Sequence, residues 1–207
     1  MTFAGSVYGM NDVTHLGFQD IPMLSNIPNL VYLAPTTKEE YIAMLDWSIE
    51  QNEHPVAIKL PGGAMVSGRP VTKNFGDLNK YEVTQKGSKV ALLGLGTFYS
   101  LANAVADEMK SELGIDATVI NPYYITGLDE ELLESLKADH SVVVTIEDGI
   151  LDGGFGEKIA RFYGDSDMKV LNYGLKKEFL DRYDVEEVLK DNRLDAEMIA
   201  EDVKGLL

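Results

Sequence analysis

Cysteine is absent from the 207-residue sequence, and basic residues are scarce: 18 Lys and Arg stand against 34 Asp and Glu, a net charge of −16. Without cysteine the chain can form no disulfide, thiolate metal site or cysteine nucleophile, and it suits a reducing compartment. The negative charge argues against nucleic acid and anionic membranes as partners, because both would be repelled. Acidity of this kind most commonly serves solubility.

Long apolar runs are also missing. No stretch approaches the roughly 20 residues that cross a bilayer. The N-terminal segment MTFAGSVYGMND has no basic region followed by an apolar stretch, so it does not resemble a signal peptide. Hydrophobic residues make up 45% of the sequence and charged residues 25%, the balance of a globular protein with an adequate core. We therefore expect a cytoplasmic protein.

Composition divides the chain into three parts. Residues 61–88 are rich in Gly and Pro and have no sustained helical period, which predicts a linker with at most one short strand around Tyr81 to Val83. Residues 1–60 contain apolar runs that predict strands at 3–8, 30–34 and 55–60. A helix is predicted between the last two strands, with Thr37 as N-cap, Glu40 completing a capping box, and apolar positions at helical spacing (Ile42, Leu45 and Ile49).

Strands and helices alternate regularly over residues 89–207. The predicted strands are 89–93, 117–121, 141–146 and 169–173, and the predicted helices are 100–113, 129–137, 156–163, 185–190 and 196–204. Such alternation is typical of a parallel sheet covered by helices on both faces. The sequence therefore predicts a three-layer α/β domain here.

Two glycine-rich turns follow predicted strands. The run Gly94-Leu95-Gly96-Thr97 lacks the third glycine of a dinucleotide-binding fingerprint, because Tyr99 stands in its place. A tight strand–helix turn is the favoured interpretation. The run Asp152-Gly153-Gly154-Phe155-Gly156 leaves two interpretations open: an anion site at a helix N-terminus, or close packing that needs no ligand.

Three histidines are candidates for chemistry. His54 and His140 are predicted to be solvated surface residues. His15 lies in a polar, glycine-bounded loop, Gly9 to Gly17, where an imidazole could donate to a substrate oxygen or move a proton near neutral pH. The alternative is a loop histidine without a function.

At this loop the sequence resembles a known family. Residues 14–29, THLGFQDIPMLSNIPN, are similar to the THxG…D…L…IPN segment of thiamine-diphosphate enzymes of the transketolase type, most of all the deoxyxylulose-phosphate synthase branch. The likeness continues in order and at matching spacing through Ala34-Pro35, Val119 to Pro122, Leu128-Asp129, Thr145 to Gly149 and Gly153 to Gly156. Each piece is short, but together they span nearly the whole chain.

The resemblance implies a domain organisation and a chemistry. Residues 1–60 resemble the second half of a pyrimidine-binding α/β domain, 61–88 the linker, and 89–207 the transketolase C-terminal domain. Family enzymes transfer a two-carbon or acyl unit from a keto donor to an aldehyde, with the intermediate carried by the thiazolium carbon of the cofactor. By the same resemblance His15 is the expected catalytic residue, and Asn11, Asp12 and Thr14 are the expected substrate-binding residues.

Cofactor and partner follow from the same resemblance. The complete enzyme would use thiamine diphosphate and Mg²⁺, but the GDG…N motif that holds the diphosphate through the metal does not occur in this sequence. No cofactor or metal residue is therefore expected in this chain, which should be inactive alone. The expected partner is a second copy in a homodimer or a chain carrying the diphosphate-binding domain, and the expected substrate is a phosphosugar or keto acid.

Three departures from the synthase pattern leave other readings open. The aspartate of the family's GADGxTH loop becomes Asn11, and two arginines fall at Ala4 and Tyr123. Because arginine suits bidentate phosphate binding, glyceraldehyde 3-phosphate is a doubtful acceptor. The alternatives are a non-catalytic interaction or scaffold module derived from the family, or part of the β-subunit of a 2-oxoacid dehydrogenase.

Overall fold

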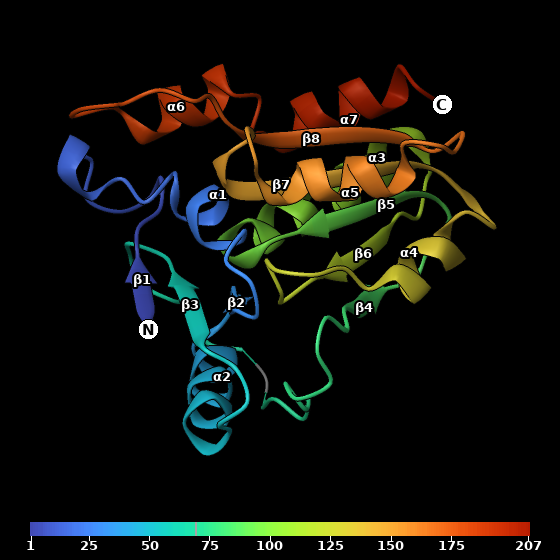
Figure 1. Ribbon diagram of the computed structural model, residues 1–207. Coiled ribbons are helices and arrows are strands. Elements are labelled where there is room, and N and C mark those ends of the chain that lie inside the picture. Colours follow the sequence, from blue (N-terminus) through green and yellow to red (C-terminus); the bar gives the residue numbers. More distant parts are fainter. Residues whose placement is uncertain (69) are drawn as a thin grey trace.

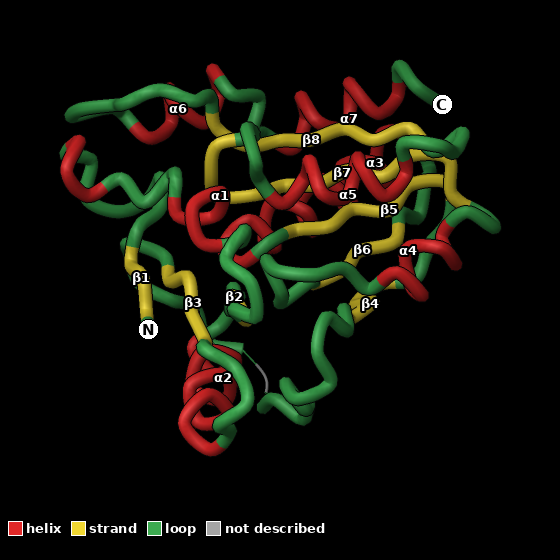
Figure 2. Tube along the Cα trace, in the orientation of Figure 1, coloured by secondary structure: helices red, strands yellow, loops and turns green. Residues whose placement is uncertain are grey.

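The computed structural model describes residues 1–68 and 70–207, with the backbone alone at positions 3 and 4. The chain forms two sheets, one of three strands and one of five, with helices packed around them (Figures 1 and 2). We refer to the parts built on these sheets as the N-terminal half and the C-terminal half.

The N-terminal half is a small parallel sheet with the order β1-β3-β2. Its strands are β1 (Thr2–Ala4), β2 (Val31–Leu33) and β3 (Val56–Leu60), and its helices are η1 (Val13–His15, a 3-10 turn), α1 (Asp20–Leu24) and α2 (Lys38–Glu50). The predicted strands are confirmed, although the first is shorter than expected. From Gly5 onward the chain leaves the sheet edge and enters the long loop that carries His15.

Helix α2 begins as predicted but buries a different face. The Thr37 hydroxyl accepts the N–H of Glu40 at 3.3 Å, and the Glu40 carboxylate accepts the N–H and hydroxyl of Thr36 and interacts with the Thr37 N–H. Met44 is fully buried, while Ile42 and Ile49 are 54% and 72% exposed. The face of the helix that enters the core is therefore the one that carries Met44.

The C-terminal half is a three-layer α/β unit with the strand order β4-β6-β5-β7-β8. The strands are β4 (Glu82–Gln85), β5 (Lys89–Gly94), β6 (Thr118–Asn121), β7 (His140–Ile150) and β8 (Lys169–Leu175). The helices are η2 (Gly96–Phe98), α3 (Tyr99–Leu113), α4 (Glu130–Leu136), α5 (Phe155–Tyr163), α6 (Val185–Asp191) and α7 (Ala196–Lys204). The sheet is parallel as predicted except for β4, which adds an antiparallel edge.

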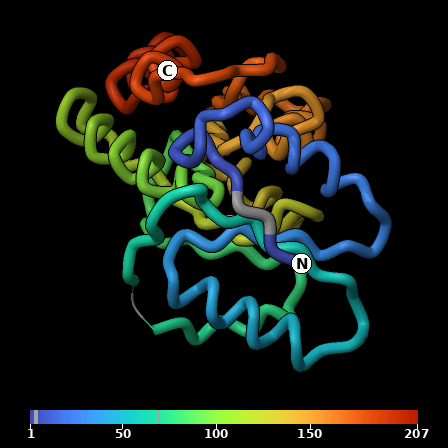
Figure 3. Tube along the Cα trace, turned by 90° about the vertical axis from the view of Figure 1, so that its left-hand side faces the viewer, coloured from blue at the N-terminus to red at the C-terminus, as the bar shows by residue number. Residues whose placement is uncertain are grey.

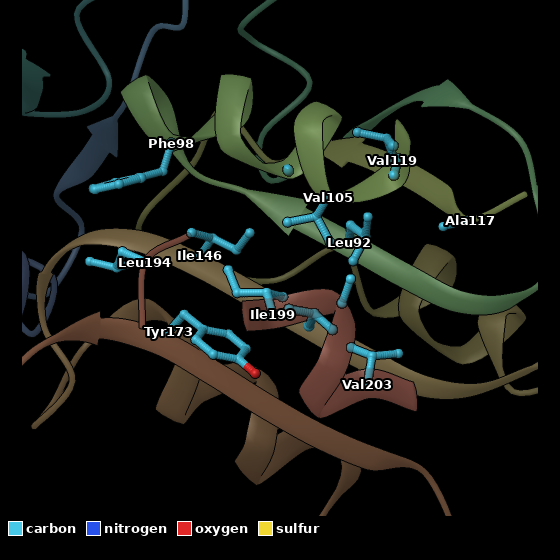
Figure 4. Packing of buried hydrophobic residues seen from close by; sticks show 14 of the residues in the cluster. Leu92, Phe98, Val105, Ala117, Val119, Ile146, Tyr173, Leu194, Ile199 and Val203 are labelled. Atoms are coloured by element: carbon cyan, nitrogen blue, oxygen red, sulfur yellow. The ribbon is translucent and has the colours of Figure 1, made fainter. Parts of the chain in front are cut away.

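Side chains alternate across this sheet. Leu92 of β5 points to the face covered by α3 and α7 (Figure 4), and Val90 belongs to the same cluster. Ala91 and Leu93 point to the face covered by α4 and α5. All four are fully buried. Burying a valine or leucine side chain stabilises the fold by roughly 1.5–3 kcal/mol, so these strands contribute strongly to the stability of the sheet.

The two sheets are joined at the free edge of β2. Segment 123–126 runs antiparallel to that strand. Hydrogen bonds of 2.7 Å run from the N–H of Ala34 to the carbonyl of Tyr123 and from the N–H of Ile125 to the carbonyl of Tyr32. The N-terminal half is therefore docked by backbone pairing, not only by side chains.

Candidate functional site

The loop from Gly5 to Gly17, which we call the His15 loop, lies beside the segment that connects β8 to α6 (Figures 1 and 3). Val7 is fully buried and Leu16 is 6% exposed, so both act as anchors in the core of the C-terminal half. His15 itself is exposed at the end of η1. The loop thus presents an accessible imidazole on a firmly anchored backbone.

A chain of hydrogen bonds orients the imidazole. The Thr14 hydroxyl lies 2.7 Å from Oδ1 of Asp12 and 2.7 Å from Nδ1 of His15. Hydrogen bonding to Thr14 holds the pKa of Asp12 below its usual range, so this carboxylate is ionised and accepts the single hydroxyl proton. Nδ1 must then carry a proton and donate it to Thr14, which leaves Nε2 as the acceptor in the neutral ring.

The structure connects Asp12, not Asn11, to the histidine. The Asn11 amide turns away and donates to the carbonyl of Tyr183 at 2.9 Å. Asp12 caps η1 by accepting the N–H of Thr14 at 3.0 Å. Of the polar residues predicted for this loop, the structure therefore brings Asp12 and Thr14 together with His15.

Lys59, which the sequence analysis did not single out, closes the base of the loop. Its Nζ donates to the carbonyls of Gly5 at 2.9 Å and Gly17 at 3.0 Å, and it lies 3.8 Å from the carboxylate of Asp20. The side chain is only 6% exposed. The signal in the sequence was a lone charge inside the apolar strand run VAIKL, because a buried ammonium requires polar partners.

Asp148, a second residue that sequence reasoning missed, comes from β7 of the C-terminal half. Its two oxygens accept the N–H of Val7 and the hydroxyl of Thr97, each at 3.2 Å. It is 4% exposed and lines a small pocket with Lys59. Both halves of the chain therefore supply buried charged groups next to the His15 loop.

The turn at 153–156 is filled by the protein's own carboxylate. Glu147 accepts the N–H of Phe155 at 2.8 Å and that of Gly156 at 2.7 Å. A Cβ on Gly154 would lie 2.6 Å from Oε2 of Glu147. Of the two interpretations, close packing is the one observed, because Glu147 occupies the place an external anion would take.

Burial affects the ionisation of this carboxylate. It raises the pKa of Glu147 to about 7, against the lowering effect of the two N–H donors. Burial also lowers the pKa of the neighbouring Lys158 ammonium to about 8, although attraction to Glu147 opposes the shift. These groups support the turn and are not part of the His15 loop.

The turn at 94–96 is a tight strand–helix connection, as predicted. Gly96 has a φ of +56°, a conformation that favours glycine. A Cβ on Gly94 would lie 2.6 Å from the Cα of Tyr99. The glycines therefore permit α3 to begin directly above the sheet.

The two positions where the family has arginine have different outcomes. The side chain at Ala4 lies outside the described part of the chain. Tyr123 is 3% exposed and packs edge-on against Phe75 with ring centroids 5.8 Å apart. Its hydroxyl donates to Glu82, and Lys73 lies 5.1 Å from its ring centroid. These contacts belong to a cleft between the halves, and none of these partners belongs to the His15 loop.

The prediction for His140 was wrong. Its side chain is 4% exposed, because Nε2 is bound to the hydroxyl of Thr118 at 2.8 Å and Nδ1 lies 2.6 Å from Asp139. His140 begins β7 and Thr118 begins β6, and this polar pair across the intervening strand β5 accounts for the burial. His54 is partly exposed, and its backbone is held by Gln51.

Within the described ranges, no group of three or more His, Asp or Glu side chains is arranged to hold a metal ion. These residues therefore do not fit a resident metal site. Nor does any described helix have the length and apolar character needed to span a bilayer.

A three-layer α/β unit with an antiparallel edge strand, joined to a second parallel sheet, places the protein in the α/β class. The family model described as "Transketolase, C-terminal domain" matches residues 79–199. That is more than half of the chain, so the chain belongs to the transketolase C-terminal domain family.

Curated relatives extend the likeness to almost the whole chain. The 1-deoxy-D-xylulose-5-phosphate synthase of Clostridium tetani is 33% identical over 201 residues, which cover 96% of this chain and 32% of the relative. The protein of the same name from Crocosphaera subtropica is 34% identical over 205 residues, covering 97% and 32%. The chain thus spans about a third of the length of these relatives.

Solved structures share the fold. A structure described as "Split gene transketolase, inactive beta4 tetramer" superposes with a TM-score of 0.78 at 23% identity, covering 99% of this chain and 64% of that one. A transketolase from Pichia stipitis gives a TM-score of 0.73 at 18% identity, covering 99% and 29%. At these identities the likeness concerns the fold alone.

Proposed function

We propose that this chain is the C-terminal portion of a thiamine-diphosphate-dependent transferase of the transketolase and deoxyxylulose-phosphate synthase type. The reaction is transfer of a two-carbon or acyl unit from a keto donor to an aldehyde acceptor. Residues 1–60 are part of a pyrimidine-binding domain, 61–88 are the linker, and 89–207 are the C-terminal domain. The relatives named above support the class, and the cysteine-free sequence suits work in the cytoplasm.

The observation that carries the proposal is the Asp12–Thr14–His15 hydrogen-bond chain. It leaves Nε2 of an exposed imidazole ready to accept a proton from a substrate hydroxyl, or to donate one when the ring is charged. His15 is the proposed catalytic residue. Thr14, Asp12 and Asn11 are the proposed substrate-binding residues; of these, Thr14 and Asp12 are hydrogen-bonded to the His15 chain, whereas the Asn11 amide binds Tyr183.

The cofactor is held elsewhere in the assembly. Thiamine diphosphate and Mg²⁺ are bound by a partner chain or by further protein that carries the diphosphate-binding domain, because the GDG…N motif does not occur in this sequence. The cofactor supplies the carbanion chemistry when bound. This chain contributes the His15 loop and a surface for self-association, and it is inactive alone.

Recovery of the native assembly tests the class. The chain is tagged in its own cells, purified with its partners, and assayed for transfer from a keto acid or ketose phosphate to an aldehyde, with and without added thiamine diphosphate. We expect activity that depends on the cofactor in the assembly and none in the chain alone. A chain that purifies without such activity and without a diphosphate-binding partner would support the scaffold alternative, and transfer to a lipoyl acceptor would support the 2-oxoacid dehydrogenase.

The role of His15 is tested in the same assembly. His15→Ala should lower turnover by about a hundredfold or more, the usual contribution of a positioned acid or base, and should leave cofactor affinity nearly unchanged. His54→Ala is the matched control, since His54 lies in another loop. Unchanged turnover in His15→Ala would remove this residue from the site.

A further inference from the structure

We infer that the C-terminal half positions the catalytic loop, with Asp148 and Tyr183 as positioning residues that hold the backbone of the His15 loop in place. The inference rests on the proposed function of His15 and assigns a task to the C-terminal half. Neither residue contacts the imidazole in the described structure, so each acts through the loop.

Val7 is the point where the two residues meet. Its N–H donates to Oδ1 of Asp148 at 3.2 Å, and its carbonyl accepts the Tyr183 hydroxyl at 3.1 Å. Both polar backbone groups of a fully buried loop residue are thus satisfied by the C-terminal half. Leaving either one without a partner would cost free energy, because buried backbone groups need hydrogen bonds.

A second group of contacts holds the part of the loop that is nearer to His15. The N–H of Arg182 donates to the carbonyl of Asn11 at 2.6 Å, and the carbonyl of Tyr183 accepts the Asn11 amide at 2.9 Å. The N–H of Val13 donates to Asp181 at 3.2 Å. Val13 begins the 3-10 turn that ends at His15, so this row fixes the orientation of the turn.

Aromatic packing reinforces the hydrogen bonds. Phe18, directly after the loop, lies with its ring centroid 5.9 Å from that of Tyr183, and Tyr8 lies 5.9 Å from Phe98. Such pairs contribute about 0.5–1.5 kcal/mol beyond area burial.

The N-terminal half, by contrast, forms its described hydrogen bonds at the base of the loop. Lys59 binds the carbonyls of Gly5 and Gly17, the two ends. Between these ends, Gly9 packs closely against Gly62, where a Cβ would lie 2.8 Å from the Gly62 Cα. The described hydrogen bonds that cross to another element come from the C-terminal half. Orientation of His15 therefore depends on Asp148 and Tyr183.

The test compares two Tyr→Phe variants that each remove one hydroxyl and keep the ring. Tyr183→Phe loses the bond to Val7, whereas the control Tyr173→Phe loses a 2.9 Å bond to Asp202, away from the loop. Hydrogen exchange of the full chain should quicken about tenfold at residues 5–17 in Tyr183→Phe alone, the equivalent of one lost hydrogen bond. Turnover of the native assembly should fall by a similar factor, with cofactor affinity unchanged.

Variants of Asp148 provide an independent test of the inference. Asp148→Ala should loosen the loop in the same way, and Asp148→Asn should restore it, because an amide oxygen can still accept the N–H of Val7. Unchanged exchange at residues 5–17 in both Tyr183→Phe and Asp148→Ala would overturn the inference, as would a loosened loop with full turnover in an assembly that His15→Ala inactivates. If His15→Ala is itself active, the proposed function fails, and hydrogen exchange alone still decides whether the C-terminal half fixes the loop.

Discussion

The hydroxyl of Thr14 lies 2.7 Å from Nδ1 of His15 and is already committed, through its only proton, to the carboxylate of Asp12. This hydrogen bond favours the neutral tautomer of His15 that carries its proton on Nδ1. A free histidine in water exchanges between tautomers, whereas here the unprotonated Nε2 of an exposed ring is available to accept a proton.

Thr14 variants test this selection. Thr14→Val keeps the shape but removes the hydroxyl, so the Nδ1–H tautomer of His15 should lose its preference and turnover of the assembly should fall about tenfold, the cost of one hydrogen bond. Thr14→Ser should retain both properties. Nitrogen NMR of the imidazole in the full chain measures the tautomer without any partner. Identical spectra for the Val and Ser variants would contradict the arrangement.

The raised pKa of Glu147 predicts that the free energy of unfolding depends on pH. Its pKa is raised by burial from 4.5 to about 7. The folded state therefore binds the proton more tightly than the unfolded state, and the stability that this proton contributes is present below about pH 4.5 and lost as the pH rises through 7. The difference amounts to roughly 3 kcal/mol across the window, as an upper estimate.

Chemical unfolding at about pH 5 and about pH 8 measures this effect. The free energy of unfolding should fall more steeply with pH in the wild type than in Glu147→Gln, which cannot titrate. Lys158 has the opposite effect. Its pKa is lowered to about 8, so its contribution to the stability of the folded protein increases only as the pH rises above that value. Equal slopes in the two proteins would show that Glu147 stays ionised throughout.

The glycine turn beside Glu147 gives a second stability test. A Cβ at Gly156 would lie 2.5 Å from Oγ1 of Thr145 and 2.8 Å from Oδ1 of Asn172, a pair joined by a 2.8 Å hydrogen bond. Gly156→Ala should cost about 1–3 kcal/mol, the usual range for overpacking. Gly164→Ala, where the Cβ meets nothing closer than 3.4 Å, is the control. Because alanine has a higher helix propensity than glycine, Gly164→Ala should be neutral or slightly stabilising. A comparable loss of stability in both variants would contradict crowding at Gly156 as the cause.

Strand–helix alternation predicted most of the fold because the core strands are nearly all apolar. The run from Val90 to Leu93 is fully buried, as its composition suggests. The strand β7 was harder, since it continues through Glu147, Asp148 and Gly149 to Ile150. Two acidic residues followed by a glycine are typical of a loop when the sequence is considered alone. Only the partners from distant segments make them strand residues.

The site was predictable only in part, for the same reason. His15, Thr14 and Asp12 were named from the family resemblance, and because they lie within four positions of one another the local chain brings them together. Lys59 and Asp148 reach the loop from elsewhere, with Asp148 separated from Val7 by 141 positions. No local pattern reports such a contact. The lone charge in an apolar strand indicated that Lys59 needs partners but not which ones.

The burial of His140 was not predicted, because its partner Thr118 lies 22 positions away in the sequence. This burial supports a final prediction. Its Nδ1 lies near two acceptors, Asp139 at 2.6 Å and the carbonyl of Leu136 at 3.1 Å, so it donates there and Nε2 accepts from Thr118. His140→Ala removes these bonds and leaves a void, and it should lower the free energy of unfolding by about 2 kcal/mol. His54→Ala should change it by less than about 0.5 kcal/mol. Urea unfolding of the full chain compares the two, and equal values would place His140 at the surface after all.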